Sequence, residues 1–194
     1  MRRRSAIWAV LPLLIACASQ AAAGSQLKTL FSAHPTVSPV HLCLAHHFDA
    51  DHLAAHPRQN ITDMLVYIGQ RQGEQDGFVY YTVNAQLKFR DSRQRYTVSG
   101  ECGRKVGEVA PIGCGIDCDG GGYELSLRTD GAVDWAITSA LRLGEPDSDA
   151  PETTVGFQVD DTRLVLHQTG LNDCLPIIND EALKAGLLRG AVTQ

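Results

Sequence analysis

The sequence predicts a mostly β protein, a single antiparallel β-barrel or β-sandwich of about seven or eight strands with one or two short helices. Three observations favour this class. Apolar and polar residues alternate from Phe78 to Arg90, which is typical of a strand with one buried and one wet face. Further short alternating stretches follow with turn residues between them, and no strand–helix–strand pattern occurs. Hydrophobic residues make up 44% of the chain and charged residues 20%, which excludes a disordered chain.

The N-terminus has the pattern of a secretory signal peptide over residues 1–23. The basic residues Arg2–Arg4 precede an apolar run over 6–18, and the alanines at 21–23 suit cleavage before the next residue. The apolar run is shorter than the about 20 residues that a membrane-spanning helix needs. We therefore expect an exported protein, secreted or periplasmic, without a transmembrane segment.

A second interpretation of this leader gives the protein a lipid anchor. The residues Leu14–Cys17 resemble a bacterial lipobox, in which the cysteine is lipidated and becomes the new N-terminus. In the simpler alternative, Cys17 is one more apolar residue of the signal peptide. Both interpretations place the mature chain outside the cytoplasm, and the first makes it a membrane-anchored lipoprotein.

The domain begins after a polar segment. Residues 24–40 are rich in Ser, Ala, Thr and Pro without periodicity, so we expect a flexible lead-in before a single disulfide-stapled β domain over 41–194. Asp49 is a suitable N-cap for a short helix that ends at Pro57. A strand is expected over 61–68.

The central strands follow in order. The alternation over 78–90 gives the clearest prediction of a strand, and 96–99 resumes the pattern after a polar turn. Alternation returns over 123–127. Asp130-Gly131 then predicts a type I′ hairpin turn, in which both central residues have positive φ, with 136–143 as the return strand.

The C-terminal part predicts one more hairpin and one helix. Two alternating stretches within 156–167 are joined at Asp160-Asp161, which indicates a turn. A helix is expected over 180–189, with Asn179 or Asp180 as its N-cap.

Five cysteines follow the signal peptide: Cys43, Cys102, Cys114, Cys118 and Cys174. In an oxidising compartment they are expected to form disulfides rather than metal sites or reactive thiols. We expect Cys102 to pair with Cys114 or Cys118 across adjacent strands, and Cys43 to pair with Cys174. One cysteine is then left over.

Histidines cluster in the predicted N-terminal helix. His52 and His56 are four residues apart and share a helical face with Asp49. With His47 as a further ligand, these residues would form a zinc or copper site. The H-E-x-x-H pattern of metalloproteases is absent. The alternative, which we favour, is a capped helical turn whose histidines bond to the backbone or lie at the surface, with no cofactor.

A glycine-rich string follows Cys114. Asp117 and Asp119 flank Cys118, and three consecutive glycines come next. Two acidic side chains beside flexible glycines would bind Ca²⁺ or another ligand. However, the spacing of a calcium loop is missing. We favour a disulfide-anchored turn that leads into the next strand.

The two strings resemble those of a group of bacterial secreted proteins. The first runs from Asp49 to Gln59 (D-x-x-H-L-A-A-H-P-R-Q), and the second runs from Cys114 to Gly122 (C-G-x-D-C-D-G-G-G). No established activity is attached to that group. The resemblance implies only that both strings belong to one fold.

The net charge and the absence of catalytic motifs disfavour several classes of function. A net charge of −5, which removal of the signal peptide makes more negative, disfavours nucleic-acid binding. No nucleophile elbow or acid–base pair is present. We therefore expect a non-enzymatic extracytoplasmic domain that binds a small ligand or a protein partner. The alternatives are a divalent-metal-binding protein that uses residues 46–56, and a hydrolase with an unrecognised carboxylate site.

Overall fold

The structure is a computed structural model. The residues that it describes are 26–32, 40–109, 111–117, 119–145 and 151–190, without the side chains of 70–75. The expected signal peptide, the lipidation candidate Cys17 and the unpaired candidate Cys118 lie outside the described residues.

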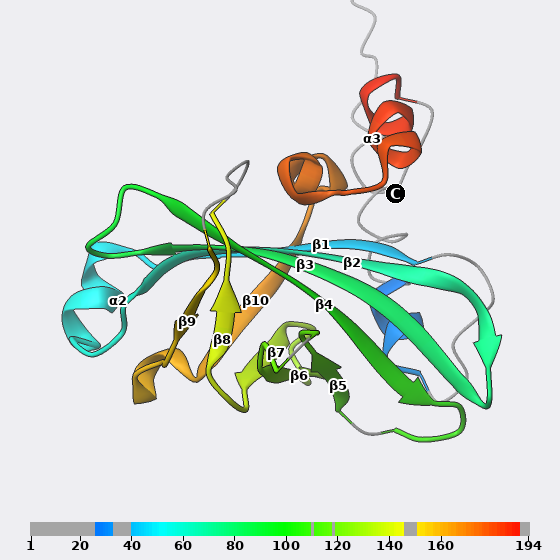
Figure 1. Cartoon of the computed structure of the whole chain (residues 1–194), viewed down its shortest axis with the longest axis horizontal. Helices are drawn as coiled ribbons and strands as arrows, with labels where there is room; N and C mark the ends of the chain where they lie inside the picture. The colour runs from blue at the N-terminus through cyan, green and yellow to red at the C-terminus, as the bar shows by residue number, and fades with distance from the viewer. Residues whose placement is uncertain (1–25, 33–39, 110, 118, 146–150, 191–194) are drawn as a thin grey trace, which may run out of the picture.

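Eight antiparallel strands close into a barrel in the order β1-β10-β7-β6-β5-β4-β3-β2 (Figure 1). They are β1 (His41–His47), β2 (Ile61–Gln75), β3 (Phe78–Phe89), β4 (Arg95–Lys105), β5 (Ile112–Gly115), β6 (Gly122–Leu127), β7 (Val133–Ile137) and β10 (Arg163–Thr169). The predicted fold class is confirmed, and its form is a closed barrel. A separate two-stranded sheet of β8 (Leu141–Leu143) and β9 (Thr153–Val155) touches β4 through a bridge between Thr97 and Gly144.

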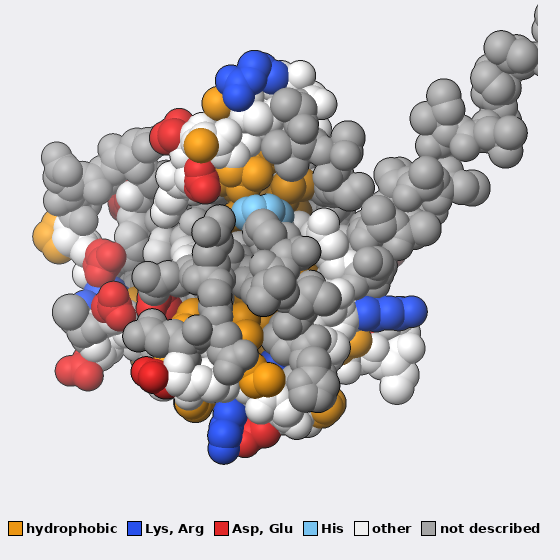
Figure 2. Space-filling view, turned by 90° about the vertical axis from the view of Figure 1, so that its right-hand side faces the viewer, with side chains coloured by type: hydrophobic (Ala, Val, Ile, Leu, Met, Phe, Trp, Pro, Cys, Tyr) orange, Lys and Arg blue, Asp and Glu red, His pale blue; other side chains and the backbone are white. Residues whose placement is uncertain are grey.

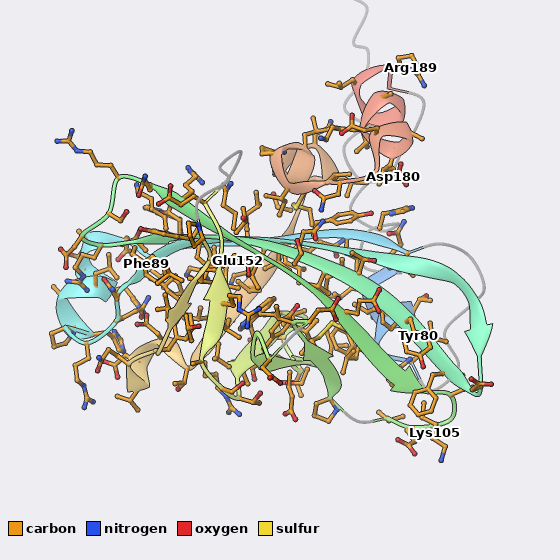
Figure 3. The ribbon with its side chains drawn as sticks, in the orientation of Figure 1. Tyr80, Phe89, Lys105, Glu152, Asp180 and Arg189 are labelled. Carbon is orange, nitrogen blue, oxygen red and sulfur yellow. A yellow bond between two sulfur atoms is a disulfide. The ribbon has the colours of Figure 1, made fainter. Side chains whose placement is uncertain are left out.

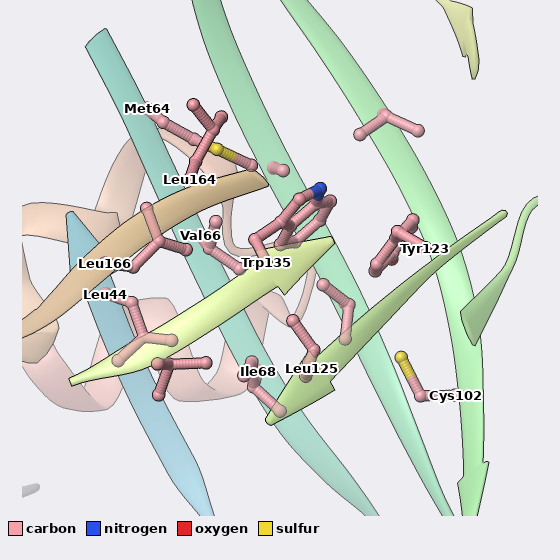
Figure 4. Packing of buried hydrophobic residues seen from close by; sticks show 14 of the residues in the cluster. Leu44, Met64, Val66, Ile68, Cys102, Tyr123, Leu125, Trp135, Leu164 and Leu166 are labelled. Atoms are coloured by element: carbon pink, nitrogen blue, oxygen red, sulfur yellow. The ribbon is translucent and has the colours of Figure 1, made fainter. Parts of the chain in front are cut away.

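Alternation along every strand fills the barrel with apolar side chains. Along β3 the inward-facing Tyr81, Val83 and Leu87 are fully buried. Trp135 lies at the centre, surrounded by aliphatic side chains from strands on all sides (Figure 4). Among the described strands of the barrel none is an edge strand, because β1 pairs with β2 on one side and with β10 on the other.

The barrel has two ends, which we name by their contents. The helix end carries α2 (Ala50–Ala55), and the hairpin end carries the β2–β3 turn. Phe89 lies at the helix end, and Tyr80 and Lys105 lie at the hairpin end (Figure 3). Seen from the hairpin end, acidic side chains gather along one side, whereas basic ones are scattered (Figure 2).

Part of the expected flexible lead-in is packed against the barrel. Residues 26–30 form a helical turn, and its Leu27 and Leu30 are buried in the main core. This finding corrects the expectation for that stretch. Two apolar side chains three residues apart lie on one helical face, and the composition around them concealed this short pattern.

A C-terminal segment covers the outside of the barrel. It consists of η2 (Leu171–Ile177) and α3 (Glu181–Leu188), which lie on the outer side of β1, β2 and β3 (Figure 1). A second apolar cluster fills the contact, and the disulfide between Cys43 and Cys174 holds it. The predicted pairing is confirmed, as is the N-cap Asp180, whose carboxylate accepts from the Leu183 N–H. No described helix has the length and apolar character that a membrane crossing needs.

The turn at Asp130-Gly131 differs from the prediction. Only Gly131 has positive φ, at 85°, and the Gly131 N–H donates to the Arg128 carbonyl at 3.1 Å. This is a three-residue loop with one left-handed glycine, not a type I′ turn. The type I′ geometry occurs instead at Asp76 and Gly77, with φ of 54° and 77°, between β2 and β3. The Asp-Gly pair that adopts this geometry is the one at residues 76–77, not the one at residues 130–131.

Two further expectations were wrong in the same region. The single strand expected over 136–143 is divided between β7 and β8. The hairpin expected over 156–167 does not form, because β9 pairs with β8 and β10 pairs with β1 and β7. The expected turn lies in η1 (Val159–Asp161). There the buried Asp161 carboxylate accepts the backbone N–H groups of Asn60 and Ile61, so it joins distant segments instead of turning the chain.

Candidate functional site

The most unusual side chain inside the barrel is Arg104 of β4. Alternation turns Val98, Gly100, Cys102 and Arg104 inward, and Arg104 lies opposite Val79 of β3. Only 3% of Arg104 is exposed, and among the described residues it is the only buried Lys or Arg. Arginine stays charged in proteins. The barrel therefore holds one buried positive charge.

This guanidinium has no protein partner among the described residues. All three of its nitrogens are buried without a hydrogen bond, as is the hydroxyl of the neighbouring Tyr81. Burial raises the pKa of Tyr81, and the charge of Arg104 together with a near hydrogen-bond contact opposes that rise. The distances and angles nevertheless give no hydrogen bond between them. Because an unpaired buried charge costs several kcal/mol, the guanidinium requires a partner.

Two more unpartnered donors face the interior. The rings of Tyr123 and Trp135 stack with centroids 3.9 Å apart, side by side at the centre of the barrel (Figure 4). The Tyr123 hydroxyl and the Trp135 Nε1 are buried without a hydrogen bond, and burial raises the pKa of Tyr123. A Cβ placed on Gly100 would lie 3.0 Å from the Tyr123 hydroxyl, so this hydroxyl lies over β4.

The sequence pattern did not single out Arg104. The available indication was its place at an inward position, two residues after Cys102 in an alternating strand. A cation at such a position conflicts with the apolar pattern around it, and such conflicts are expected at functional sites.

The predicted histidine helix forms as expected. Asp49 caps it, because its Oδ1 accepts the His52 backbone N–H at 2.7 Å. The rings of His52 and His56 stack with centroids 4.2 Å apart. The His52 Nε2 donates to Oε1 of the buried Gln59 at 2.9 Å, and the His56 Nδ1 donates to the His52 carbonyl at 2.9 Å. Arg90 holds this segment in place, because its Nη2 donates to three backbone carbonyls of the segment at 2.9–3.3 Å.

The third expected ligand lies apart from this helix. The His47 Nδ1 lies 2.6 Å from Oδ1 of Asp63 on β2, and Lys88 Nζ lies 3.8 Å from the other carboxylate oxygen. Within the described ranges, no group of three or more His, Cys, Asp or Glu side chains is arranged to hold a metal ion. The structure therefore does not bring His47, His52 and His56 together as one ligand set.

A row of imidazole and phenyl rings, each in contact with the next, extends from α2 to the barrel wall. It runs from His56 and His52 through Phe48 to His46 and His167, with Phe48 4.0 Å from His46 and His167 5.6 Å from His46. Burial lowers the pKa of His46 below its ordinary 6.5, a backbone hydrogen bond opposes this, and the neighbouring histidines add to it. The folded state therefore disfavours protonated His46. The contribution of neutral His46 to the free energy of unfolding is fully present above about pH 6.5 and is lost as the pH falls through and below that value.

The glycine-rich string forms a packed turn between β5 and β6. Asp117 and Asp119 are exposed on it. Gly121 has a φ of 97°, and a Cβ there would lie 1.9 Å from the Ala140 carbonyl oxygen. The glycine is thus required by the close approach of the segment that leads into β8. The turn lies at the helix end, as α2 does, but among the described residues no hydrogen bond or ring contact joins the two strings.

Comparisons with family models, with curated proteins and with solved structures gave no match for the chain. The geometry of the described residues is therefore the only basis for assigning a function.

The histidine helix can be tested with metal. We expect micromolar Zn²⁺ or Cu²⁺ to leave the melting temperature of the untagged protein unchanged, because one ring nitrogen of each histidine already bonds to Gln59 or to the His52 carbonyl and no third ligand among the described residues completes a metal site. The variants His52→Ala and His56→Ala should each lose about 0.5–1.5 kcal/mol, as expected for one hydrogen bond. Calorimetry with and without metal measures both effects.

A metal-binding helix would behave differently in the same experiment. Stability would rise with metal concentration by RT ln(1 + [L]/Kd). The rise would be absent from the double variant His52→Ala/His56→Ala. That combination would reinstate His52 and His56 as ligands.

Proposed function

We propose that the mature chain is a non-enzymatic extracytoplasmic barrel that binds a small carboxylate at Arg104. The observation that carries this proposal is the buried guanidinium without a partner among the described residues. A guanidinium presents a planar fork of donors that matches the two oxygens of a carboxylate. A bound carboxylate would convert a costly lone charge into a neutral, hydrogen-bonded pair.

The surroundings favour a small ligand with one negative charge. Arg104 supplies a single positive charge, and the neighbouring inward-facing side chains such as Val79 are apolar. A doubly charged phosphate or sulfate would leave one negative charge unpaired in an apolar interior, which is unfavourable. The barrel centre is filled by Trp135, Tyr81 and Tyr123. We therefore favour a ligand of the size of acetate or a short-chain carboxylic acid.

The compartment is supported by the cysteines. The disulfides Cys43–Cys174 and Cys102–Cys114 fit an oxidising setting outside the cytoplasm. The sequence pattern of residues 1–23 supports export, and the Leu14–Cys17 string supports a lipid anchor as its variant.

The test replaces the charge by an apolar side chain of similar length. In Arg104→Met we expect the unfolding free energy without carboxylate to rise by about 1–4 kcal/mol, because a buried charge is removed. Acetate, titrated against chloride at constant ionic strength, should stabilise the wild type by RT ln(1 + [L]/Kd) and leave Arg104→Met unchanged. Urea unfolding followed by tryptophan fluorescence measures both quantities.

Two control variants make the outcome specific. Lys105→Met removes the same charge from the next residue, which faces outward and is exposed, and should retain the acetate response. Glu74 lies opposite Val79 in the register of β2 and β3, so Glu74→Gln tests whether the chain supplies the carboxylate itself. Equal acetate responses in wild type and Arg104→Met would contradict the proposal. So would a loss of stability in Glu74→Gln that Arg104→Met relieves.

A further inference from the structure

A small polar cleft lies outside the barrel, where the C-terminal segment approaches β3 and β4. Its volume is about 250 Å³, and it lies between the outer face of these strands and the chain around Pro176 and Asn179. The strand side of the cleft carries Asn84, Thr97 and Ser99, which alternation turns outward. Asn84 and Ser99 are direct partners across the two strands. The cleft and the interior site at Arg104 are therefore on opposite faces of the same wall.

Asn84 is a buried residue in the lining of this cleft. Only 4% of the residue is exposed, and its Nδ2 donates to the Ile177 carbonyl at 2.9 Å. Because a carbonyl can only accept, this bond fixes the orientation of the amide. The Oδ1 atom is then a buried acceptor, and it has no partner among the described residues. A buried acceptor without a donor costs about 1–3 kcal/mol, so Asn84 requires an N–H or O–H group that the described chain does not provide.

The other lining groups indicate the chemistry of that donor. None of the lining residues is charged, so a charged ligand would lack a counter-charge there. The Thr97 hydroxyl donates to the Gly144 carbonyl at 3.3 Å, which leaves its oxygen free to accept. Ser99 and Asn179 are exposed and can each donate and accept. A ligand with several hydroxyl groups can donate to Asn84 and Thr97 and also accept from Ser99 and Asn179.

We propose that this cleft is a binding site for a neutral, hydroxyl-rich ligand of the size of one sugar unit. Its volume lies just below the about 300–1,000 Å³ of clefts for drug-sized ligands, which suits a single ring. Asn84 Oδ1 accepts a ligand hydroxyl, and Ser99 and Asn179 bond to the neighbouring hydroxyls. The site is independent of the carboxylate site, since it uses different residues on the other face of the wall.

The experiment is an NMR titration of the full mature protein with two probes, glucose and N-acetylglucosamine. We expect saturable shifts of the Asn84 side-chain amide and of the Ser99 and Asn179 backbone amides, with millimolar affinity. In Ser99→Ala the dissociation constant should rise about 3- to 10-fold, which corresponds to one lost hydrogen bond. The control Thr82→Ala lies two residues before Asn84 on the same face of β3 and outside the lining of the cleft, and it should bind as the wild type does.

Variants at exposed positions of the cleft test the proposal even if Asn84 is needed for folding. Asn84→Leu removes the bond to Ile177 and can release the C-terminal segment, so Ser99→Ala and Asn179→Ala, both at exposed positions, carry the test. No saturable shift of cleft resonances with either sugar would overturn the proposal, and water would then be the partner of Asn84. Unchanged affinity in both exposed variants would overturn it as well. Acetate should leave the cleft resonances in place, which separates this site from Arg104.

Discussion

Removing the disulfide between Cys43 and Cys174 should lower the unfolding free energy by about 4–5 kcal/mol, since the cross-link closes a very long loop. The two residues are 131 positions apart, and both are buried in the cluster under the C-terminal segment. Without the cross-link, the unfolded chain gains the entropy of that loop. The double variant Cys43→Ala/Cys174→Ala, unfolded in urea, measures the loss.

The second disulfide provides the matched comparison. Cys102 and Cys114 are only 12 positions apart and lie on adjacent strands. Chain entropy predicts about 3 kcal/mol or less for a loop of this length. We therefore expect Cys102→Ala/Cys114→Ala to be the milder change. The loop-entropy explanation fails if the short cross-link turns out to stabilise the protein more than the long one.

The variant Gly121→Ala should be destabilised by about 3–4 kcal/mol. Part of this loss, about 1–2 kcal/mol, comes from the left-handed backbone, which any side chain disfavours. The remainder comes from the added Cβ, which would lie 1.9 Å from the Ala140 carbonyl oxygen. The segment leading into β8 would have to move. Thermal and urea unfolding report the loss.

Gly107 separates these two contributions. Its φ of 90° is similarly left-handed, but nothing lies within 4 Å of a Cβ built on it. Gly107→Ala should therefore lose only about 1–2 kcal/mol. Equal losses in the two variants would show that the turn next to Asp119 can move away from Ala140. The glycine-rich string would then be free to serve a ligand instead of forming a packed turn.

The fold could be predicted where the reasons are local. Strict alternation over 78–90 predicted β3. The residue types at Asp49 and at Asn179 or Asp180 predicted both helix starts. Barrel closure depends on the pairing of β1 with β10, which are more than 100 residues apart. No periodicity indicates such a pairing. The pairing of β8 with β9 was not predicted for the same reason, because the length of the chain between them does not indicate which strand pairs with which.

The site residues were less predictable than the fold. The histidine segment was a predicted candidate site because its residue types are concentrated, but their concentration does not indicate the bonds that Gln59 and Arg90 make with it. Asn84 and Arg104 were not predicted because neither belongs to a motif or to a cluster of chemically similar residues. Their significance depends on which face of the strand they lie on and on buried polar atoms, Asn84 Oδ1 and the Arg104 nitrogens, that have no described partner. Those are tertiary properties, although an inward Arg beside Cys102 follows from alternation alone.

The cross-link between Cys43 and Cys174 also changes what a protease can do to this protein. The loops that connect the strands of the barrel lie between these two cysteines in the chain. A single cut in any of them, such as the exposed turn at Asp117, produces two pieces that remain covalently joined. The nicked molecule keeps its mass apart from one added water, and every strand stays tethered to its neighbours. If the proposed extracytoplasmic location is right, one proteolytic cut there leaves the domain as a single covalent molecule.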